Sequence, residues 1–396
     1  MKRVNNIYDE IYNIDNLKLA YKESSRNKHH YKEVKEFEKD TEKLLYKIQE
    51  SLKNQTYSIP ESHYTFKIIN DKGKERELMK LKYYPHRIVQ WAIMLQIEKY
   101  FIETIPDFAC ASIPNRGIDK AYKFITSFLM DRKNTEYCLK IDIKKFYPNI
   151  DKEILKKLLR HKFKDKRLLW LLDLIIDSYP KDKGIPIGSY TSQYFANFYL
   201  AYFDHWLKQE KKIKYVVRYM DDIVILHYDK EFLHNLKKDI DKYLADNLKL
   251  VVKENHQVFP VESRGIDFIG FVFRHNNIRL RKKNALALRK TVNNIFKNNE
   301  NNKTMSFRQF CSINSRLGFF QYFNNKGLYN KYIVPLLKSM ELYYNYYVLE
   351  YKASNKLKNK DKIKRTFKYI GDIRKKQYMR KRIRPLTHKS SRIDRE

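Results

Sequence analysis

The sequence predicts a mixed fold of the α+β class, in which helices and strands occupy different stretches of the chain. Residues 1–60 and the region after Asn284 carry apolar residues at helical spacing. Between Tyr137 and Phe273, β-branched residues gather instead in short runs. The clearest run is VVRYMDDIVIL, Val216–Leu226, which predicts a hairpin with two adjacent carboxylates at its turn.

Composition indicates a large core and a polyanionic partner. The 396 residues are 43% hydrophobic, and Lys and Arg outnumber Asp and Glu by 82 to 46, a formal charge of +36. Nucleic acid compensates such a charge best. No apolar run reaches the roughly twenty residues that a membrane span requires, and the N-terminus lacks a signal-peptide pattern. We therefore expect a soluble cytoplasmic protein without membrane contact.

The first part of the chain predicts helices followed by a basic hairpin. Residues 1–60 indicate two helices that form an N-terminal helical extension. Tyr64–Leu81 has the pattern of two strands around a turn at Gly73, and it is rich in lysine and arginine. A helix from Pro85 to about Tyr100 follows, with an apolar stripe.

The middle of the chain alternates loops, strands and helices. A glycine loop near Gly117 precedes a helix, and either a backbone turn or a nucleic-acid contact of Arg116 explains it. YCLKIDI, Tyr137–Ile143, predicts a strand, and Asp151 is placed to cap the helix that comes next. GIPIGSYTSQ, residues 184–193, is predicted to be a loop leading into a helix that runs to Leu200.

The remainder predicts an amphipathic helix, further strands and a helical end. Apolar residues recur at helical spacing from Phe232 to Leu244. Strand patterns follow at Leu248–Val252 and Gly265–Phe273. From about Asn284 the chain is helical and rich in aromatic residues, and residues 349–396 form a basic tail.

Three carboxylates suggest the chemistry. Acidic residues are common at hairpin turns, so Asp221 and Asp222 alone are more typical of a solvated turn than of a catalytic site. If the strand that ends at Asp142 lies beside the hairpin, three carboxylates meet at one end of a sheet. Their repulsion raises their pKa values unless a cation intervenes. Two Mg²⁺ ions about 4 Å apart would satisfy such a site and support nucleotidyl transfer.

The order of the motifs resembles that of reverse transcriptases. IDIKKFYPNI resembles motif A of their palm, GIPIGSYTSQ motif B and YMDD motif C. KGKEREL with HRIVQ resembles the fingers motifs, LVVKENHQVFP motif D, and GIDFIGF the primer grip. The resemblance covers roughly Tyr64 to Leu280. It implies a right-hand polymerase with fingers at 61–134, a palm at 135–275 that includes the motif B loop and helix at 184–200, and a helical thumb at 276–348.

The resemblance also implies roles for single residues. Asp142 and Asp221 would be metal ligands, with Asp222 as an auxiliary and Ile143 completing the site. The implied dNTP-binding residues are Lys74, Arg76, Phe146, Tyr147, Gly188 and Gln193. Candidate nucleic-acid contacts are Arg87, Arg116, Arg289, Arg308 and Arg316. Tyr147 falls at the sugar-discriminating position, and Lys253 is a candidate proton donor. Phe146 as a core residue and Lys253 as a solvated lysine are the alternatives.

Motif B departs from the common pattern of the family. The chain has Ile187 before Gly188 and Gln193 after Ser192, a form IGxxxSQ that resembles the enzymes of bacterial diversity-generating retroelements and of phage defence. Loss of an amide beside the nascent base pair leads to the hypothesis of low copying fidelity.

The expected function is RNA-directed DNA polymerisation. The enzyme would use two Mg²⁺ ions and dNTPs, and would bind a structured RNA template and an RNA/DNA heteroduplex. A small accessory protein or self-assembly would complete the complex. The alternatives are a catalytically silent RNA-binding scaffold and an RNA-dependent RNA polymerase.

Overall fold

The computed structural model describes residues 3–71, 74–299, 309, 312–313, 315–316, 318–322 and 326–336. The chain divides into two compact units, Met1–Ile269 and Gly270–Glu396, which are considered one at a time. The predicted basic tail at 349–396 and Arg308 lie outside the described residues.

The N-terminal extension contains four helices rather than the two predicted. These are α1 (Tyr8–Tyr12), α2 (Ile14–Ser25), α3 (Lys32–Phe37) and α4 (Thr41–Lys53). Asn13 separates the first two because its side chain accepts a hydrogen bond from the Asp15 N–H, which caps the start of α2. Apolar side chains such as Leu17, Ile48 and Leu52 are buried and join the main core.

The predicted basic hairpin is present. Strands β1 (Tyr64–Asp71) and β2 (Lys74–Leu81) pair antiparallel from Tyr64–Leu81 to Asp71–Lys74. A short π-helical segment, η2 (Tyr83–Arg87), leads into α5 (Ile88–Thr104). Helix α5 is buried along most of its length because its apolar residues occur all round the helix.

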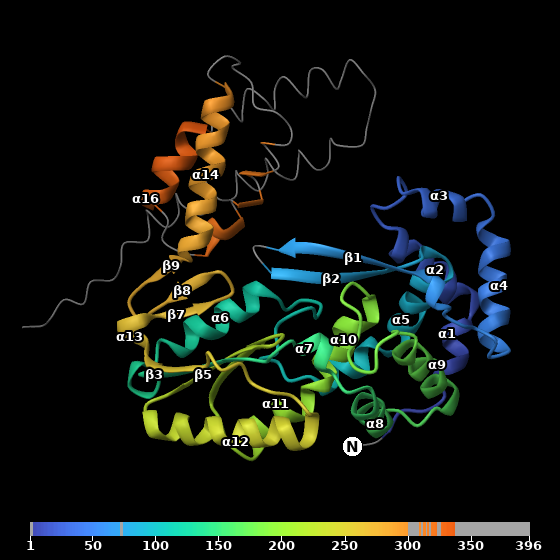
Figure 1. The fold of residues 1–396 in the computed structure, drawn as a ribbon, viewed down its shortest axis with the longest axis horizontal. Coiled ribbons are helices and arrows are strands. Elements are labelled where there is room, and N and C mark those ends of the chain that lie inside the picture. Colours follow the sequence, from blue (N-terminus) through green and yellow to red (C-terminus); the bar gives the residue numbers. More distant parts are fainter. Residues whose placement is uncertain are drawn as a thin grey trace, which may run out of the picture. The chain divides into compact units, whose positions relative to one another are not determined.

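A four-stranded antiparallel sheet forms the centre of the first unit, with the strand order β4-β5-β3-β6 (Figure 1). Its members are β3 (Tyr137–Asp142), β4 (Tyr215–Tyr219), β5 (Asp222–His227) and β6 (Gln257–Pro260). The interiors of β4 and β5 are buried on both faces. Helices must therefore cover both sides of this sheet.

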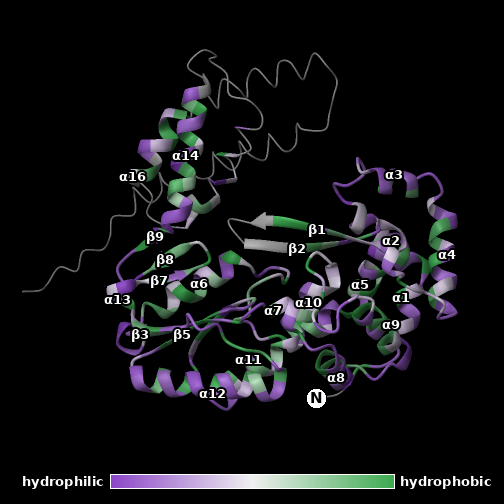
Figure 2. Ribbon diagram, viewed as in Figure 1, coloured by the Kyte–Doolittle hydropathy of each residue, from purple (hydrophilic) through white to green (hydrophobic). Residues whose placement is uncertain are grey.

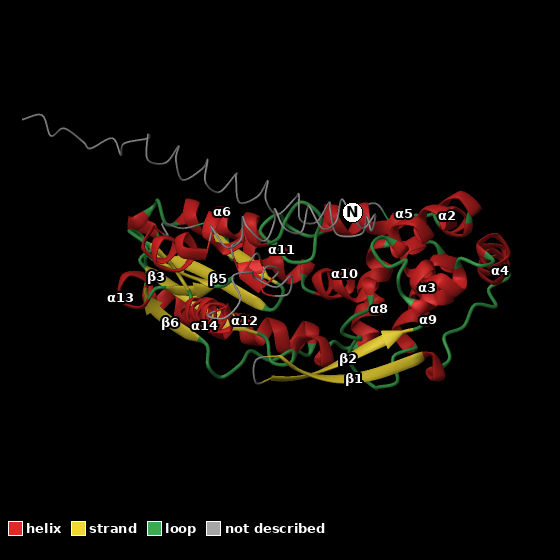
Figure 3. Ribbon diagram, turned by 90° about the horizontal axis from the view of Figure 1, so that it is seen from above, coloured by secondary structure: helices red, strands yellow, loops and turns green. Residues whose placement is uncertain are grey.

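Helices on both sides bury the sheet (Figure 3). Helix α12 (Lys230–Leu248) contacts β3, β5 and β6 through Leu236, Ile240 and Leu244, and its polar residues face outward (Figure 2). Helix α6 (Ile118–Phe128) contacts β4. The connecting helices are α7 (Phe146–Asn149), α8 (Lys152–Lys162), α9 (Lys166–Asp177), α10 (Tyr190–Tyr199) and α11 (Ala201–Gln209). Asp151 caps α8 as predicted, since its carboxylate accepts the Ile154 N–H.

Two predicted strands differ from the structure. Leu248–Val252 contains no strand and only an isolated bridge between Val252 and Ile143, because α12 continues to Leu248. Gly265–Phe273 is interrupted at Ile269 and Gly270, which have φ values of 44° and 95°. These left-handed residues end β7 (Ile266–Phe268), which follows α13 (Val261–Arg264).

The second unit begins with a hairpin of β8 (Phe271–Phe273) and β9 (Ile278–Leu280). Helix α14 (Lys282–Asn299) follows and buries Leu288, Val292 and Ile295. Short turns complete the described part: η4 (Gly318–Gln321), α16 (Lys326–Leu328) and η5 (Tyr329–Ile333). None of the described helices combines the length and apolar composition needed to cross a membrane.

Candidate active site

The central sheet brings the three predicted carboxylates together. Asp142 on β3 pairs directly with Asp222 on β5. The backbone N–H of Ile143 donates to the carbonyl of Asp221 at 3.2 Å, which ties the end of β3 to the hairpin turn. Because directly paired residues project to the same face of a sheet, Asp142 and Asp222 share one face. Two carboxylates that are eighty positions apart in the chain are thus neighbours, as a shared metal site requires.

The hairpin turn is tight and places Asp221 at its tip. Tyr219 pairs with Asp222, so only Met220 and Asp221 connect β4 to β5. Met220 has a φ of 60°, in the left-handed region that non-glycine residues rarely adopt. Type II′ turns have a positive φ at their first central residue and are favoured in hairpins. The YMDD segment therefore holds a backbone geometry that its own residue types do not favour.

Two lysines lie against these carboxylates. Lys253 forms an ion pair with Asp142, and its backbone N–H donates to the Asp142 carbonyl at 2.8 Å. The Nζ of Lys140 lies 3.4 Å from Asp222 Oδ1. Burial, opposed by Lys140 and reinforced by Asp142, raises the pKa of Asp222 to about 6. The site thus concentrates negative charge in a desolvated position that neighbouring cations only partly offset.

The donor set fits a hard divalent cation in its chemistry. Carboxylate oxygens are the ligands that Mg²⁺ prefers. Asp222 Oδ1 is buried, and its ion-pair partner Lys140 Nζ lies 3.4 Å away without meeting the geometry of a hydrogen bond, which leaves this oxygen able to bind a cation. Within the described part of the chain, no three His, Cys, Asp or Glu residues are yet spaced as a preformed metal cage. Substrate phosphates and water would therefore supply the remaining ligands.

Tyr147 and Phe146 occupy different environments at the start of α7. Phe146 is buried in the main core, which favours the structural role over nucleotide contact. Tyr147 is half-buried, with its hydroxyl 3.9 Å from Met220 Sδ. Burial, with a smaller effect of Asp221, raises the pKa of Tyr147 above its usual range. The structure therefore brings Tyr147, and not Phe146, to the YMDD turn.

The motif B loop is joined to the basic hairpin. The Met79 N–H on β2 donates to the Ile187 carbonyl at 3.0 Å. Gly188 has a φ of 112°, and a Cβ there would lie 3.0 Å from the Met79 carbonyl oxygen. Only glycine permits this approach without strain. Gln193 is exposed on α10, and Ile187 is half-buried. The loop can thus present Gly188 and Gln193 to a ligand.

The arginine and lysine side chains predicted to bind nucleic acid or dNTP lie in different environments. Arg116 binds the carbonyls of Ile105, Pro106 and Ala109, so its guanidinium organises a loop and is not open to nucleic acid. Arg87 is half-buried, and burial lowers its pKa. In the second unit Arg289 is exposed on α14 and Arg316 is half-buried. The side chains of Lys74 and Arg76 lie outside the described residues, as does Arg308.

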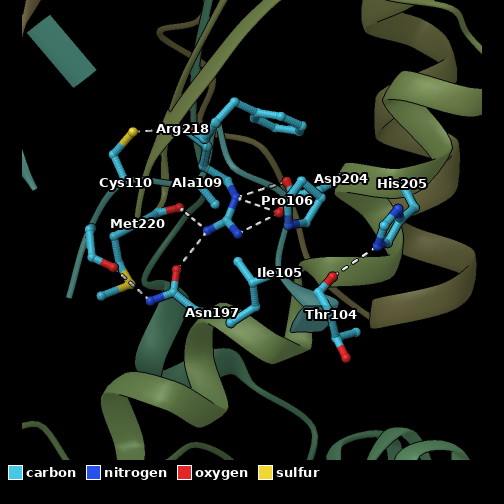
Figure 4. A network of polar contacts seen from close by, with 12 residues as sticks. Thr104, Ile105, Pro106, Ala109, Cys110, Asn197, Asp204, His205, Arg218 and Met220 are labelled. Carbon is cyan, nitrogen blue, oxygen red and sulfur yellow. Dashed lines mark hydrogen bonds and ion pairs between the residues drawn. The ribbon is translucent and has the colours of Figure 1, made fainter. Parts of the chain in front are cut away.

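A buried polar network beneath the turn was not predicted (Figure 4). Arg218 on β4 and Asp204 on α11 are both fully buried and form an ion pair. Asn197 on α10 accepts a further hydrogen bond from Arg218. A signal was available in the sequence, since Arg218 interrupts an apolar strand and Asp204 an apolar helix. Opposite charges in apolar segments imply a buried pair.

The geometry and the sequence agree on one family. A family model described as "Reverse transcriptase (RNA-dependent DNA polymerase)" matches residues 68–273, slightly more than half of the 396-residue chain. The chain belongs to the reverse transcriptase family. This membership confirms the α+β class and the reverse transcriptase fold expected from the sequence. The match includes the strands of Asp142 and Asp222, the turn of Asp221 and the motif B loop of this reverse transcriptase.

Solved structures with a distant likeness are yeast telomerases. The telomerase of Candida tropicalis without its C-terminal domain has 12% identity over 55% of each chain and a TM-score of 0.42. That of Candida albicans with a TWJ fragment of telomeric RNA has 11% identity over 82% of this chain and 68% of that chain, with a TM-score of 0.44. The chain spans about half the length of the first telomerases it matches. The comparison with curated proteins gave no significant match.

Proposed function

We propose that this protein is an RNA-directed DNA polymerase that copies a dedicated structured RNA by two-metal nucleotidyl transfer. The observation that carries the proposal is the convergence of Asp142, Asp221 and Asp222 at the β3–β5 end of the sheet. Family membership over residues 68–273 supports the same reaction. The formal charge of +36 supports a nucleic-acid substrate.

Each part of the site has a role in this reaction. Asp142 and Asp221 would hold two Mg²⁺ ions, with Asp222 and the backbone at Ile143 supporting them. When bound, the ions activate the primer hydroxyl and offset charge on the leaving pyrophosphate. Lys253, which forms an ion pair with Asp142, would give a proton to that leaving group. The ring of Tyr147 would close the space that a ribose 2′-hydroxyl needs, so that dNTPs are favoured.

The motif B loop supports a bacterial retroelement or defence role. Its IGxxxSQ form resembles that of enzymes that diversify genes or act against phage. In either role, the enzyme binds its template RNA by shape and by contacts to the phosphate backbone, together with the RNA/DNA product. A small accessory protein or a second copy would complete the assembly in the cytoplasm. Sequencing the nucleic acid that copurifies with the protein distinguishes the two roles, because only a retroelement yields copies of a variable gene template.

The decisive experiment is primer extension on RNA. Purified protein with Mg²⁺, dNTPs and a primed RNA template is expected to make cDNA, and Asp221→Asn is expected to abolish it. Asp173→Asn on the surface of α9 is the matched control, since it removes an equivalent charge from an ion pair with Arg160. Absence of cDNA from the parent protein, with biological activity retained in Asp221→Asn, would favour the scaffold alternative. Incorporation of NTPs in preference to dNTPs would favour an RNA polymerase.

A further inference from the structure

The fully buried guanidinium of Arg218 lies under the catalytic turn. Arg218 pairs with Ile223 across β4 and β5, and therefore projects to the core face of the sheet, opposite to Asp142 and Asp222. Both Arg218 and Asp204 have no exposed side-chain surface. A charge so deeply buried is tolerated only when it is paired and hydrogen-bonded. The hydrogen bonds of each guanidinium nitrogen therefore indicate the role of Arg218.

Asp204 holds two of the three guanidinium nitrogens. Nε donates to Oδ1 at 2.8 Å and to Oδ2 at 3.1 Å, and Nη2 donates to Oδ2 at 2.5 Å. Such a bidentate pair fixes the plane of the guanidinium as well as its position. Asp204 lies on α11, so this helix sets the direction of the remaining nitrogen, Nη1 (Figure 4).

Nη1 points at the turn. It donates to the carbonyl of Met220 at 3.0 Å and to Asn197 Oδ1 at 3.1 Å. The Asn197 amide nitrogen donates to the carbonyls of Ala111 and Gln193, at 2.9 and 3.2 Å, so its oxygen must face Arg218. Asn197 belongs to the motif B helix α10. The network therefore joins motif B to the turn of motif C.

The position of the Met220 carbonyl affects the backbone of Asp221 directly. It belongs to the planar peptide unit whose nitrogen is that of Asp221. Met220 adopts a left-handed conformation, which costs a non-glycine residue free energy and persists only where its surroundings hold it. The carbonyl of Asp221 itself accepts the Ile143 N–H at 3.2 Å. The peptide groups on both sides of Asp221 are thus fixed, one by Arg218 and the other by β3.

The backbone of Arg218 is anchored as well. Its N–H donates to the Phe108 carbonyl at 3.0 Å, and its own carbonyl accepts the Cys110 N–H at 2.8 Å. Arg116 binds the carbonyl of Ala109 in the same loop. Arg218 is therefore immobilised from its main chain to the tip of its side chain, as a residue that fixes another group must be.

We propose that Arg218 is a positioning residue for polymerisation, which acts through the Met220 carbonyl to hold Asp221 in the geometry that binds the catalytic cation. The inference rests on the proposed function. Arg218 itself contacts neither substrate nor metal. A buried ion pair that served stability alone could be replaced by apolar residues of similar size without loss. The hydrogen bond from Arg218 to the Met220 carbonyl explains why a charged pair occupies this position.

The test separates positioning from stability. In the double variant Arg218→Met, Asp204→Leu, both charges are removed together, so the fold is expected to persist. Arg218→Lys keeps the charge opposite Asp204 but cannot bond Asp204, Asn197 and Met220 at once. Asp165→Asn is the stability control, because Asp165 is buried and caps α9 far along the chain from the turn. Urea unfolding, Mn²⁺ binding by electron paramagnetic resonance, and single-nucleotide extension are measured for each protein.

Both Arg218 variants are expected to bind Mn²⁺ about tenfold more weakly and to lose about a hundredfold in kcat, with the KM for dNTP changed less than about threefold. Asp165→Asn is expected to lower the unfolding midpoint and keep the Mn²⁺ affinity. Folded Arg218 variants with parental Mn²⁺ affinity and kcat would overturn the proposal. If the parent makes no cDNA, the proposed function fails, and the comparison of Mn²⁺ affinities still decides the role of Arg218.

Discussion

Asp142 and Asp222 stand directly opposite each other on β3 and β5, at the end of the sheet where the YMDD turn emerges. Cβ atoms of such pairs lie about 5 Å apart. Like charges at that distance destabilise a sheet, and here partial burial of Asp222 adds to the cost. The fold therefore maintains an unfavourable pair, which is typical of a site where function and stability conflict.

Replacement of Asp222 tests this conflict. Asp222→Asn is expected to raise the free energy of unfolding by about 1 kcal/mol in metal-free buffer, because it removes a charge that burial and the neighbouring Asp142 disfavour more than Lys140 stabilises it. The same variant is expected to slow cDNA synthesis. Urea unfolding and primer extension provide the two measurements. Asp173→Asn, which breaks a surface ion pair with Arg160, should change neither the free energy of unfolding nor the rate of cDNA synthesis by much. A destabilised Asp222→Asn protein would contradict the prediction.

Gly188 is expected to be required for the contact between motif B and the basic hairpin. In Gly188→Ala, the new Cβ meets the Met79 carbonyl oxygen in addition to the strain of a φ of 112°. The expected cost is about 2 kcal/mol of stability with a raised KM for dNTP. Gly117→Ala is the matched control, because Gly117 has a φ of 93° but no atom near its Cβ. It should cost about 1 kcal/mol and leave the KM unchanged. Equal effects on KM would argue against a specific contact.

Tyr147 is expected to set the choice of sugar. Tyr147→Ala opens space beside the catalytic turn, and should raise kcat/KM for an NTP relative to its dNTP by about a hundredfold. Tyr147→Phe keeps the ring and loses only the distant contact of the hydroxyl with Met220 Sδ, at 3.9 Å. It should retain the selectivity of the parent. The measurement is incorporation of matched NTP and dNTP on one primed RNA. Unchanged discrimination in Tyr147→Ala would exclude this role.

His86 makes the fingers region sensitive to acid. The imidazole is buried between Tyr57 and His63, at 2.8 and 2.7 Å, and burial lowers the pKa of His86 to about 3. In the unfolded chain the same group takes up a proton near pH 6.5. The unfolded state therefore binds more protons between these values, and the stability contributed by neutral His86 is lost as the pH falls below about 6.5.

The measurement is urea unfolding at about pH 7.5 and about pH 5.5, where linkage predicts a loss of about 1 kcal/mol attributable to His86. In His86→Gln, this part of the acid sensitivity should disappear. His234→Gln, at an exposed position on α12, should behave as the parent does. If His86→Gln loses as much stability on acidification as the parent, another group is responsible.

Local patterns were sufficient for much of the chain. Alternating and β-branched runs predicted the strands of the hairpin, and helical spacing predicted α5, α9 and α12. Interruptions within apolar segments were harder to predict from the sequence. The N-terminal extension has four helices instead of two, and the segment at Gly265–Phe273 is divided by left-handed residues. Such breaks depend on single capping or turn residues that periodicity averages over.

By itself, the sequence determined the family and the class of fold, and it predicted the carboxylates of the site, because these follow from local motifs in a fixed order. Tertiary structure alone decided which residues meet. The register of β3 and β5 sets Asp142 against Asp222, and packing directs Arg116 to loop carbonyls and buries Phe146. The ion pair of Arg218 and Asp204 likewise depends on how α11 crosses the sheet. Sheet register and helix packing are long-range properties, and residues distant in sequence are brought together only once the whole core has formed.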